Sequence, residues 1–176
     1  MGRPLFSFTK PCYSDGPMTK SDVIQAIIAS LKDEELRFKD IADKARASAI
    51  DTEIKQEAKY DTRSIEAGYL AGSLARRYEE IIVARQEMEL FKPRSFLQDE
   101  AVAAGALLRT RNDAVEKYYL ITPNTGGIHV RIENKDIHAL SVESRMGQLL
   151  MGSLVGDCVE IPSPKGAREI EILEIF

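Results

Sequence analysis

The sequence is poor in the residues on which disulfide, zinc and redox proteins depend. Its 176 residues include two cysteines, Cys12 and Cys158, which lie far apart and form no CxxC pair. Two thiols exclude a disulfide framework and give no sign of a zinc or redox centre. The sequence also lacks an apolar run near the roughly 18 residues of a membrane span and the apolar segment of a secretory signal. We therefore expect a cytoplasmic protein that does not contact membranes.

An excess of positive charge is also missing. The chain has 24 Lys and Arg against 28 Asp and Glu, a net charge of −4 and a pI of about 5.4. Sequence-independent binding to duplex nucleic acid favours a basic patch and a domain pI above about 9. We therefore expect a protein partner and no direct specific DNA binding, and we treat the chain as a monomer.

The usual motifs of catalysis and nucleotide binding are absent. No GxxxxGK[ST], GxSxG or HExxH sequence occurs, and Gly126-Gly127 indicates a turn. His129 and His138 have no Cys or His near them in the sequence, so both are interpreted as structural or exposed. The sequence offers no catalytic residues of its own and no tightly bound cofactor.

Two long helices are predicted in the first half of the chain. No Gly or Pro interrupts residues 21–67, and Ser21 or Asp22 can serve as the N-cap. Apolar residues recur at helical spacing in two stripes: Ile24, Ile27, Ile28, Leu31, Phe38, Ile41, Ala42, Ala45 and Ala49, then Ala67, Leu70, Ala71, Leu74, Tyr78, Ile81 and Met88. With a short polar turn between them, they predict an antiparallel coiled-coil hairpin of about 45 Å.

Two glycines inside the second stripe carry a further expectation. Each glycine costs a helix about 1 kcal/mol relative to alanine. Gly68 and Gly72 lie four residues apart on one helical face. Their spacing predicts a close approach to the neighbouring helix.

The pattern changes after Pro93. Apolar runs typical of strands occupy residues 102–109, 117–122, 128–132, 158–161 and 169–176, with one short helix expected at 145–152. This predicts an α+β fold with a mostly antiparallel sheet. We divide the chain into a flexible N-terminal extension (1–17), the hairpin (18–92) and the sheet domain (93–176).

Two separate stretches resemble the GreA/GreB transcription elongation factors. Residues 52–60, TEIKQEAKY, are similar to the loop and the start of the second helix in these factors, and residues 59–71, KYDTRSIEAGYLA, with Ala75-Arg76-Arg77 resemble more specifically a Gre-related branch of bacterial proteins. Residues 141–152, SVESRMGQLLMG, and then GDCVEI at 156–161, resemble the family's serine-led loop, short helix and Gly-Asp turn. The resemblance extends from about Met18 to Phe176.

The resemblance implies a fold, a partner and a mechanism. It implies a coiled coil that enters the secondary channel of RNA polymerase and an FKBP-like C-terminal domain on the channel rim. In cleavage-competent members, acids at the coiled-coil tip help bind a Mg²⁺ ion shared with the polymerase active site. Such a protein is an accessory factor to the polymerase's own catalysis and no enzyme by itself.

The tip of this chain departs from the best-known pattern. Glu53 takes the place of the first tip acid, whereas Gln56 stands at the second and Glu57 follows it. A neutral amide is a weaker ligand than a carboxylate for the hard cation Mg²⁺. Glu53, Glu57 and Asp51 are the metal-delivery candidates. The same acids also fit a solvated helix end.

The remaining candidates have structural alternatives as well. Asp61 can cap the second helix and Tyr60 can pack at the tip, while Arg76 and Arg77 are interpreted as ion-pair partners of Glu80. Ser144 and Arg145 match the family's rim-docking loop, with Arg145 where the family has proline. Prolyl isomerase activity is discounted because residues 93–176 have few aromatic side chains to line a pocket.

Three functions remain open at this point. The first is a channel factor that stimulates transcript cleavage through Glu53 and Glu57. The second is a channel binder that modulates or inhibits polymerase without cleavage. The third is a coiled-coil adaptor for another protein.

Overall fold

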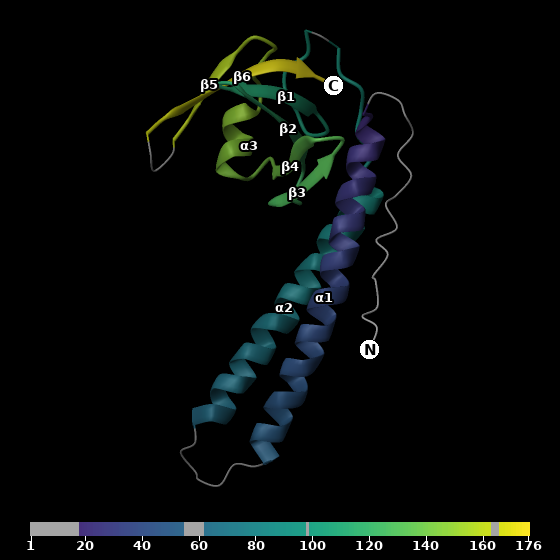
Figure 1. Cartoon of the computed structure of the whole chain (residues 1–176), viewed down its shortest axis with the longest axis vertical. Helices are drawn as coiled ribbons and strands as arrows, with labels where there is room; N and C mark the ends of the chain where they lie inside the picture. The colour runs from purple at the N-terminus through teal and green to yellow at the C-terminus, as the bar shows by residue number, and fades with distance from the viewer. Residues whose placement is uncertain (1–17, 55–61, 98, 163–165) are drawn as a thin grey trace, which may run out of the picture.

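A long helical hairpin projects from a small sheet domain in the computed structural model, which describes residues 18–54, 62–97, 99–162 and 166–176 (Figure 1). The hairpin consists of α1 (Lys20–Ile54) and α2 (Thr62–Leu90). The sheet domain contains β1 (Leu107–Asn112), β2 (Val115–Thr122), β3 (Ile128–Ile132), β4 (Lys135–Ser141), α3 (Arg145–Leu150), β5 (Cys158–Ile161) and β6 (Arg168–Ile175). The predicted α+β class is confirmed. The expected extension at 1–17 lies outside the described residues.

Helix α1 begins one residue before the predicted cap. The Thr19 hydroxyl accepts a hydrogen bond from the Asp22 backbone N–H at 3.2 Å, and the Asp22 carboxylate accepts from the Thr19 backbone N–H at 2.9 Å. This reciprocal pair is a capping box, with Thr19 as the N-cap. The prediction of Ser21 or Asp22 as N-cap is therefore wrong: Asp22 supports the cap from inside the first turn.

The predicted close approach at the two glycines of α2 is also wrong. Gly68 and Gly72 are exposed, and a Cβ built on either one would meet no atom within 4 Å among the described residues. The inner side of this part of α2 is formed by partly buried small and apolar side chains such as Ala67, Ala71 and Leu74. Helix packing therefore does not explain the glycines.

The sheet has the strand order β3-β4-β2-β1-β6-β5. All neighbouring strands are antiparallel except β2 and β4, which pair in parallel from Tyr118↔Ile137 to Thr122↔Ser141. Strand β4 was missing from the sequence prediction. A two-residue turn at Glu133 and Asn134 joins it to β3, and both residues have positive φ, 46° and 65°. This turn type usually carries glycine, so its signal was weak in the sequence.

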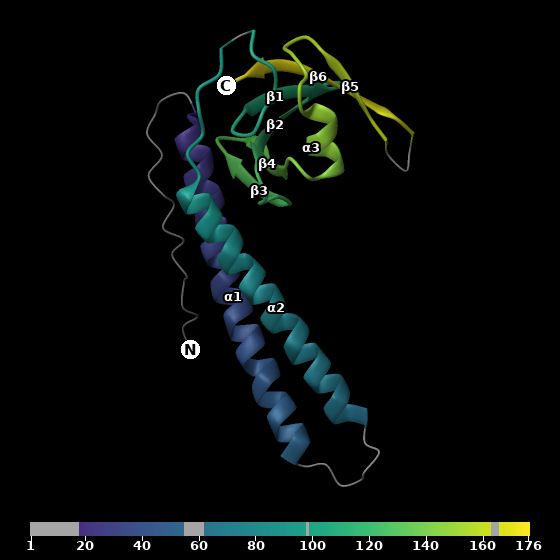
Figure 2. The same cartoon turned by 180° about the vertical axis from the view of Figure 1, so that it is seen from behind.

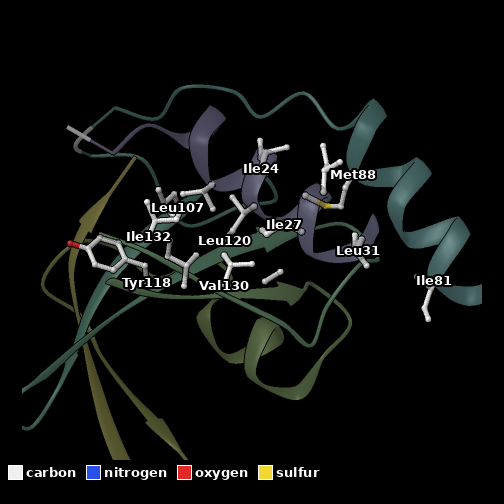
Figure 3. Packing of buried hydrophobic residues seen from close by; sticks show 14 residues of the cluster. Ile24, Ile27, Leu31, Ile81, Met88, Leu107, Tyr118, Leu120, Val130 and Ile132 are labelled. Atoms are coloured by element: carbon white, nitrogen blue, oxygen red, sulfur yellow. The ribbon is translucent and has the colours of Figure 1, made fainter. Parts of the chain in front are cut away.

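Both faces of the sheet are covered, one by the base of the hairpin and the other by α3. On the hairpin side, α1 and α2 pack against β1–β4, and Figure 3 shows α1 and α2 side chains converging on this face. We call this the hairpin–sheet core; it includes Ile24, Ile27, Leu31, Met88, Leu107, Leu120, Val130 and Ile137. Leu150 of α3 closes a second core with Leu108, Tyr119, Ile121 and Ile172. Burial on both faces explains the uninterrupted apolar run in β2.

Lys20 ties the start of the hairpin to the segment that follows α2. Its ammonium donates to the carbonyl oxygens of Arg94 at 2.5 Å and Gly105 at 2.9 Å, and it lies 4.6 Å from the centre of the Phe96 ring. Burial and the nearby Arg94 charge lower the pKa of Lys20 to about 8. The hairpin and the sheet are thus joined by a shared core and by hydrogen bonds, while the division at 92/93 stays a prediction.

Candidate functional site: the hairpin tip and the start of α3

The described ends of α1 and α2 lie at the end of the hairpin farthest from the sheet (Figures 1 and 2). The 35 residues of α1 correspond to about 50 Å of helix at 1.5 Å per residue. Among the side chains of α1 that the structure describes, the buried ones lie in its first three turns, from Val23 to Leu31. Most of the hairpin therefore extends beyond the core that holds it.

The predicted metal-delivery residues lie at or next to this distant end. Asp51 is exposed in the last turns of α1, and the backbone of Glu53 is in the same turns, whereas the side chain of Glu53 lies outside what is described. Glu57, Tyr60 and Asp61 fall outside the described residues. Among the residues that are described, no group of three or more His, Cys, Asp or Glu could hold a metal ion. The metal-delivery role stays a prediction for these positions.

Ion pairs join the two helices in the half of the hairpin nearest the sheet. Arg85 of α2 is the best buried of these cations, with 19% of its side chain exposed, and it contacts Glu35 of α1 at 2.6 Å and Glu89 at 2.7 Å. These carboxylates hold the pKa of Arg85 above its ordinary value. Lys32 adds a bridge from α1 to Glu89 at 3.1 Å. The sequence gives no sign of this role for Arg85, because its principal partner, Glu35, is 50 residues away.

The two adjacent arginines predicted as ion-pair partners behave differently. Arg77 contacts Glu80 at 3.3 Å, as predicted, and also Glu34 of α1 at 3.1 Å. Arg76 is exposed and makes no ion pair with any residue that the structure describes. The ion-pair interpretation is therefore confirmed for Arg77 and wrong for Arg76.

The two docking candidates occupy the start of α3. Ser144 is its N-cap: the hydroxyl accepts from the Gly147 backbone N–H at 3.0 Å and donates to the Ser141 carbonyl at 2.7 Å. Arg145 follows as the first helical residue and is exposed. The serine thus fixes the local backbone, and the arginine presents its charge to solvent. Docking itself stays a prediction.

The two histidines come together although they are nine residues apart. His129 and His138 are cross-strand partners on β3 and β4, and their rings stack with centroids 4.3 Å apart. Burial, the charge of His129 and the charge of Lys117 lower the pKa of His138, while Asp136 opposes them. The interpretation as structural or exposed histidines fits this pair, since the His129 side chain is 53% exposed. Only the missed strand β4 could have indicated their contact.

Comparison with known proteins shows similarity to transcription elongation factors. The family described as "Transcription elongation factor, GreA/GreB, C-term" matches residues 98–176. The transcription elongation factor GreA of Acidiphilium cryptum (strain JF-5) is 30% identical over 125 residues, which cover 70% of this chain and 73% of that protein. GreA of Chlorobium phaeobacteroides (strain BS1) is 51% identical over 41 residues, which are 23% of this chain and only 26% of that protein.

Among solved structures, the chain is similar to the GreA factor homolog 1 (Gfh1) protein of Thermus thermophilus. The two share 19% sequence identity with a TM-score of 0.36, and the match covers 86% of this chain and 96% of that one. Within the described residues, no helix is both long enough and apolar enough to cross a membrane.

Proposed function

Because the chain belongs to the GreA/GreB family of transcription elongation factors, we propose that it binds RNA polymerase with its hairpin in the secondary channel and its sheet domain on the rim. The observation that carries this proposal is the hairpin itself. About 50 Å of α1 is anchored by a core near one end only, which leaves the other end free to reach into a partner. In this role the chain assists the polymerase's catalysis, in the cytoplasm, as a monomer.

The finer proposal is that the tip stimulates transcript cleavage in backtracked complexes. Glu53 and Glu57 would supply carboxylates to a Mg²⁺ ion shared with the polymerase, with Asp51 close by. Carboxylate oxygen is the donor that Mg²⁺ prefers, so this donor set fits the ion. When bound, such an ion activates a water molecule for attack on a phosphodiester. The contribution of this chain is to carry and orient the carboxylates.

At the rim, the proposal assigns docking to the start of α3. The Ser144 cap holds the first turn in place, so that Arg145 projects from a fixed helix end. Arginine can pair in a bidentate manner with a carboxylate on the partner. An acidic rim on the polymerase would therefore suit Arg145, in place of the family's proline.

Stalled, backtracked elongation complexes test the cleavage proposal. Adding the wild-type protein is expected to shorten the RNA from its 3′ end, and the Glu53→Ala/Glu57→Ala double variant is expected to lose this effect while still binding polymerase. Asp33→Ala, an exposed acid on α1 far from the tip, is the matched control and should cleave like the wild type.

The alternatives give different results in the same experiment. Binding without any change in RNA length would exclude cleavage and favour a non-cleaving channel regulator, a role in keeping with the neutral Gln56 in the tip sequence. Failure to bind purified polymerase would exclude the proposal of channel binding. The remaining hypothesis would then be a coiled-coil adaptor for another protein.

A further inference from the structure

A groove lies in the angle between α2 and the loop that joins β2 to β3. Its volume is about 530 Å³, and Leu31, Ile81 and Ile128 contribute apolar surface to it.

A smaller pit of about 260 Å³ adjoins the groove and is lined largely by Met88, Leu90, Phe91 and Pro123. Glu87, Asn124 and Thr125 border both, so groove and pit form one continuous surface along the second half of α2.

The groove has an excess of negative charge. Four carboxylates line it, from Glu34, Glu79, Glu80 and Glu87, against the two guanidinium groups of Arg76 and Arg77. Arg77 is already paired with Glu34 and Glu80. Glu79 is exposed and forms no ion pair with any of the described residues. Glu87 accepts hydrogen bonds from neutral groups only, so a cation entering the groove would meet two carboxylates without an ion pair among the described residues, Glu79 and Glu87, against the one unpaired guanidinium group of Arg76.

The wall opposite α2 is hydrogen-bonded to that helix and includes two glycines. The Glu87 carboxylate accepts hydrogen bonds from the Thr125 hydroxyl at 2.9 Å and the Asn124 amide at 3.1 Å, which fix the loop to the helix. Gly126 and Gly127 follow in the same wall. A Cβ on Gly126 would lie 2.8 Å from the Ser141 backbone nitrogen, so this glycine is required for the close packing of the loop. The groove is consequently preformed and accessible to a side chain from outside.

We propose that this groove binds a cationic segment of RNA polymerase, with lysine or arginine side chains along the carboxylates of α2 and one apolar side chain in the pit. The proposal rests on the proposed function, since it takes polymerase as the partner, but it concerns a surface separate from the tip and from α3. A nucleic acid is disfavoured because the carboxylates repel phosphate. A small polycation would use the carboxylates but leave the apolar pit empty.

The test places a photo-crosslinking residue in the groove of the full chain. Val83 lines the groove and is 53% exposed, so Val83→p-benzoylphenylalanine puts the probe there without disturbing the core. Val115, 56% exposed at the start of β2, is the matched position outside the groove. Each protein is irradiated with purified RNA polymerase, and the crosslinked polymerase peptide is identified by mass spectrometry.

The proposal predicts a crosslink from position 83 to a polymerase peptide rich in lysine and arginine, with a weaker or absent crosslink from position 115. Adding Glu79→Lys should reduce the yield at position 83 about fivefold, in a salt-dependent manner, whereas Glu160→Lys on β5 should leave it unchanged. A crosslink at position 83 whose yield does not change with Glu79→Lys or with added salt would overturn the proposal, because the carboxylates of the groove would then take no part in binding.

Two further outcomes would overturn the groove proposal, and one of them would also overturn the proposed function. If the protein binds polymerase but position 83 crosslinks no better than position 115, or crosslinks to a peptide without basic residues, only the groove proposal fails. If no binding to polymerase is measured for any of these proteins, the proposed function fails together with it.

Discussion

Glycines at two places in this chain should respond in opposite ways to the same substitution. Gly68 and Gly72 lie on the open face of α2, where an added methyl group meets nothing, so alanine removes a helix-weakening residue at no steric cost. Gly147 of α3 lies against the Ser141 carbonyl, with which a Cβ would collide. Gly68→Ala and Gly72→Ala should each raise the free energy of unfolding by about 1 kcal/mol, and Gly147→Ala should lower it by about 1–3 kcal/mol.

Chemical denaturation of the three variants against the wild type measures these changes. A destabilising effect of Gly68→Ala or Gly72→Ala would mean that a neighbour lies closer to α2 than the structure places it. If both variants are more stable but bind polymerase less well, the glycines serve the complex, because the isolated chain does not use them.

The titration of His138 is a second prediction at the residue scale. Burial, His129 and Lys117 all disfavour its protonated form, so its pKa should lie below the ordinary histidine value of about 6.5. The unfolded chain then binds the proton more readily than the folded one. Stability should therefore fall as the pH drops below about 6.5 and through the folded-state pKa, and His138→Gln should lose less stability over this range.

Proton NMR of the histidine rings measures this pKa directly. In His129→Gln the pKa of His138 should rise, because a neighbouring positive charge is removed, yet stay below the ordinary value, because burial is the larger cause. A wild-type pKa at or above the ordinary value would contradict the packing of the His129–His138 pair.

At the scale of elements, the hairpin and the sheet are expected to unfold together. Ile27 of α1 is fully buried in the hairpin–sheet core (Figure 3). Ile27→Ala should lower the free energy of unfolding by about 2–5 kcal/mol and increase amide hydrogen exchange both in α1 and in β2–β4. Ile50→Ala is the matched control: this side chain is 51% exposed in the distal hairpin, so a change within about 0.5 kcal/mol is expected. Faster exchange in α1 alone would show that the hairpin folds independently.

The elements differed in how well the sequence predicted them. The bounds of β3 and β5 were predicted residue for residue, because turn residues flank short apolar runs. Strand β4 was not predicted, because the turn that joins it to β3, Glu133-Asn134, has neither Gly nor Pro. The Arg85–Glu35 ion pair and the hydrogen bonds from Lys20 to two carbonyl groups were not predicted either, since 50 to 85 residues separate the partners in sequence. Local patterns predict elements, whereas such contacts depend on how the elements meet.

At the scale of the whole molecule, the protein is one long helical arm anchored to the sheet near one end. The predicted hairpin followed from the two apolar stripes, and its placement on the sheet follows from the buried side chains of α1 from Val23 to Leu31. The sequence could not predict this placement, because the same apolar stripe of α1 packs against both α2 and the sheet. The arm carries the tip sequence about 50 Å along α1.

Energy transfer between the hairpin and the transcript tests the central claim most directly. A dye is placed at Ile50, near the distal end of α1, or at Val115 in the sheet domain, and the acceptor is attached near the RNA 3′ end of a backtracked elongation complex. Insertion of the hairpin predicts efficient transfer from position 50 and weak transfer from position 115, since the length of α1 is comparable to the working range of the dyes. Equal transfer from both positions, or stronger transfer from position 115, in a complex that demonstrably contains the protein would contradict the account.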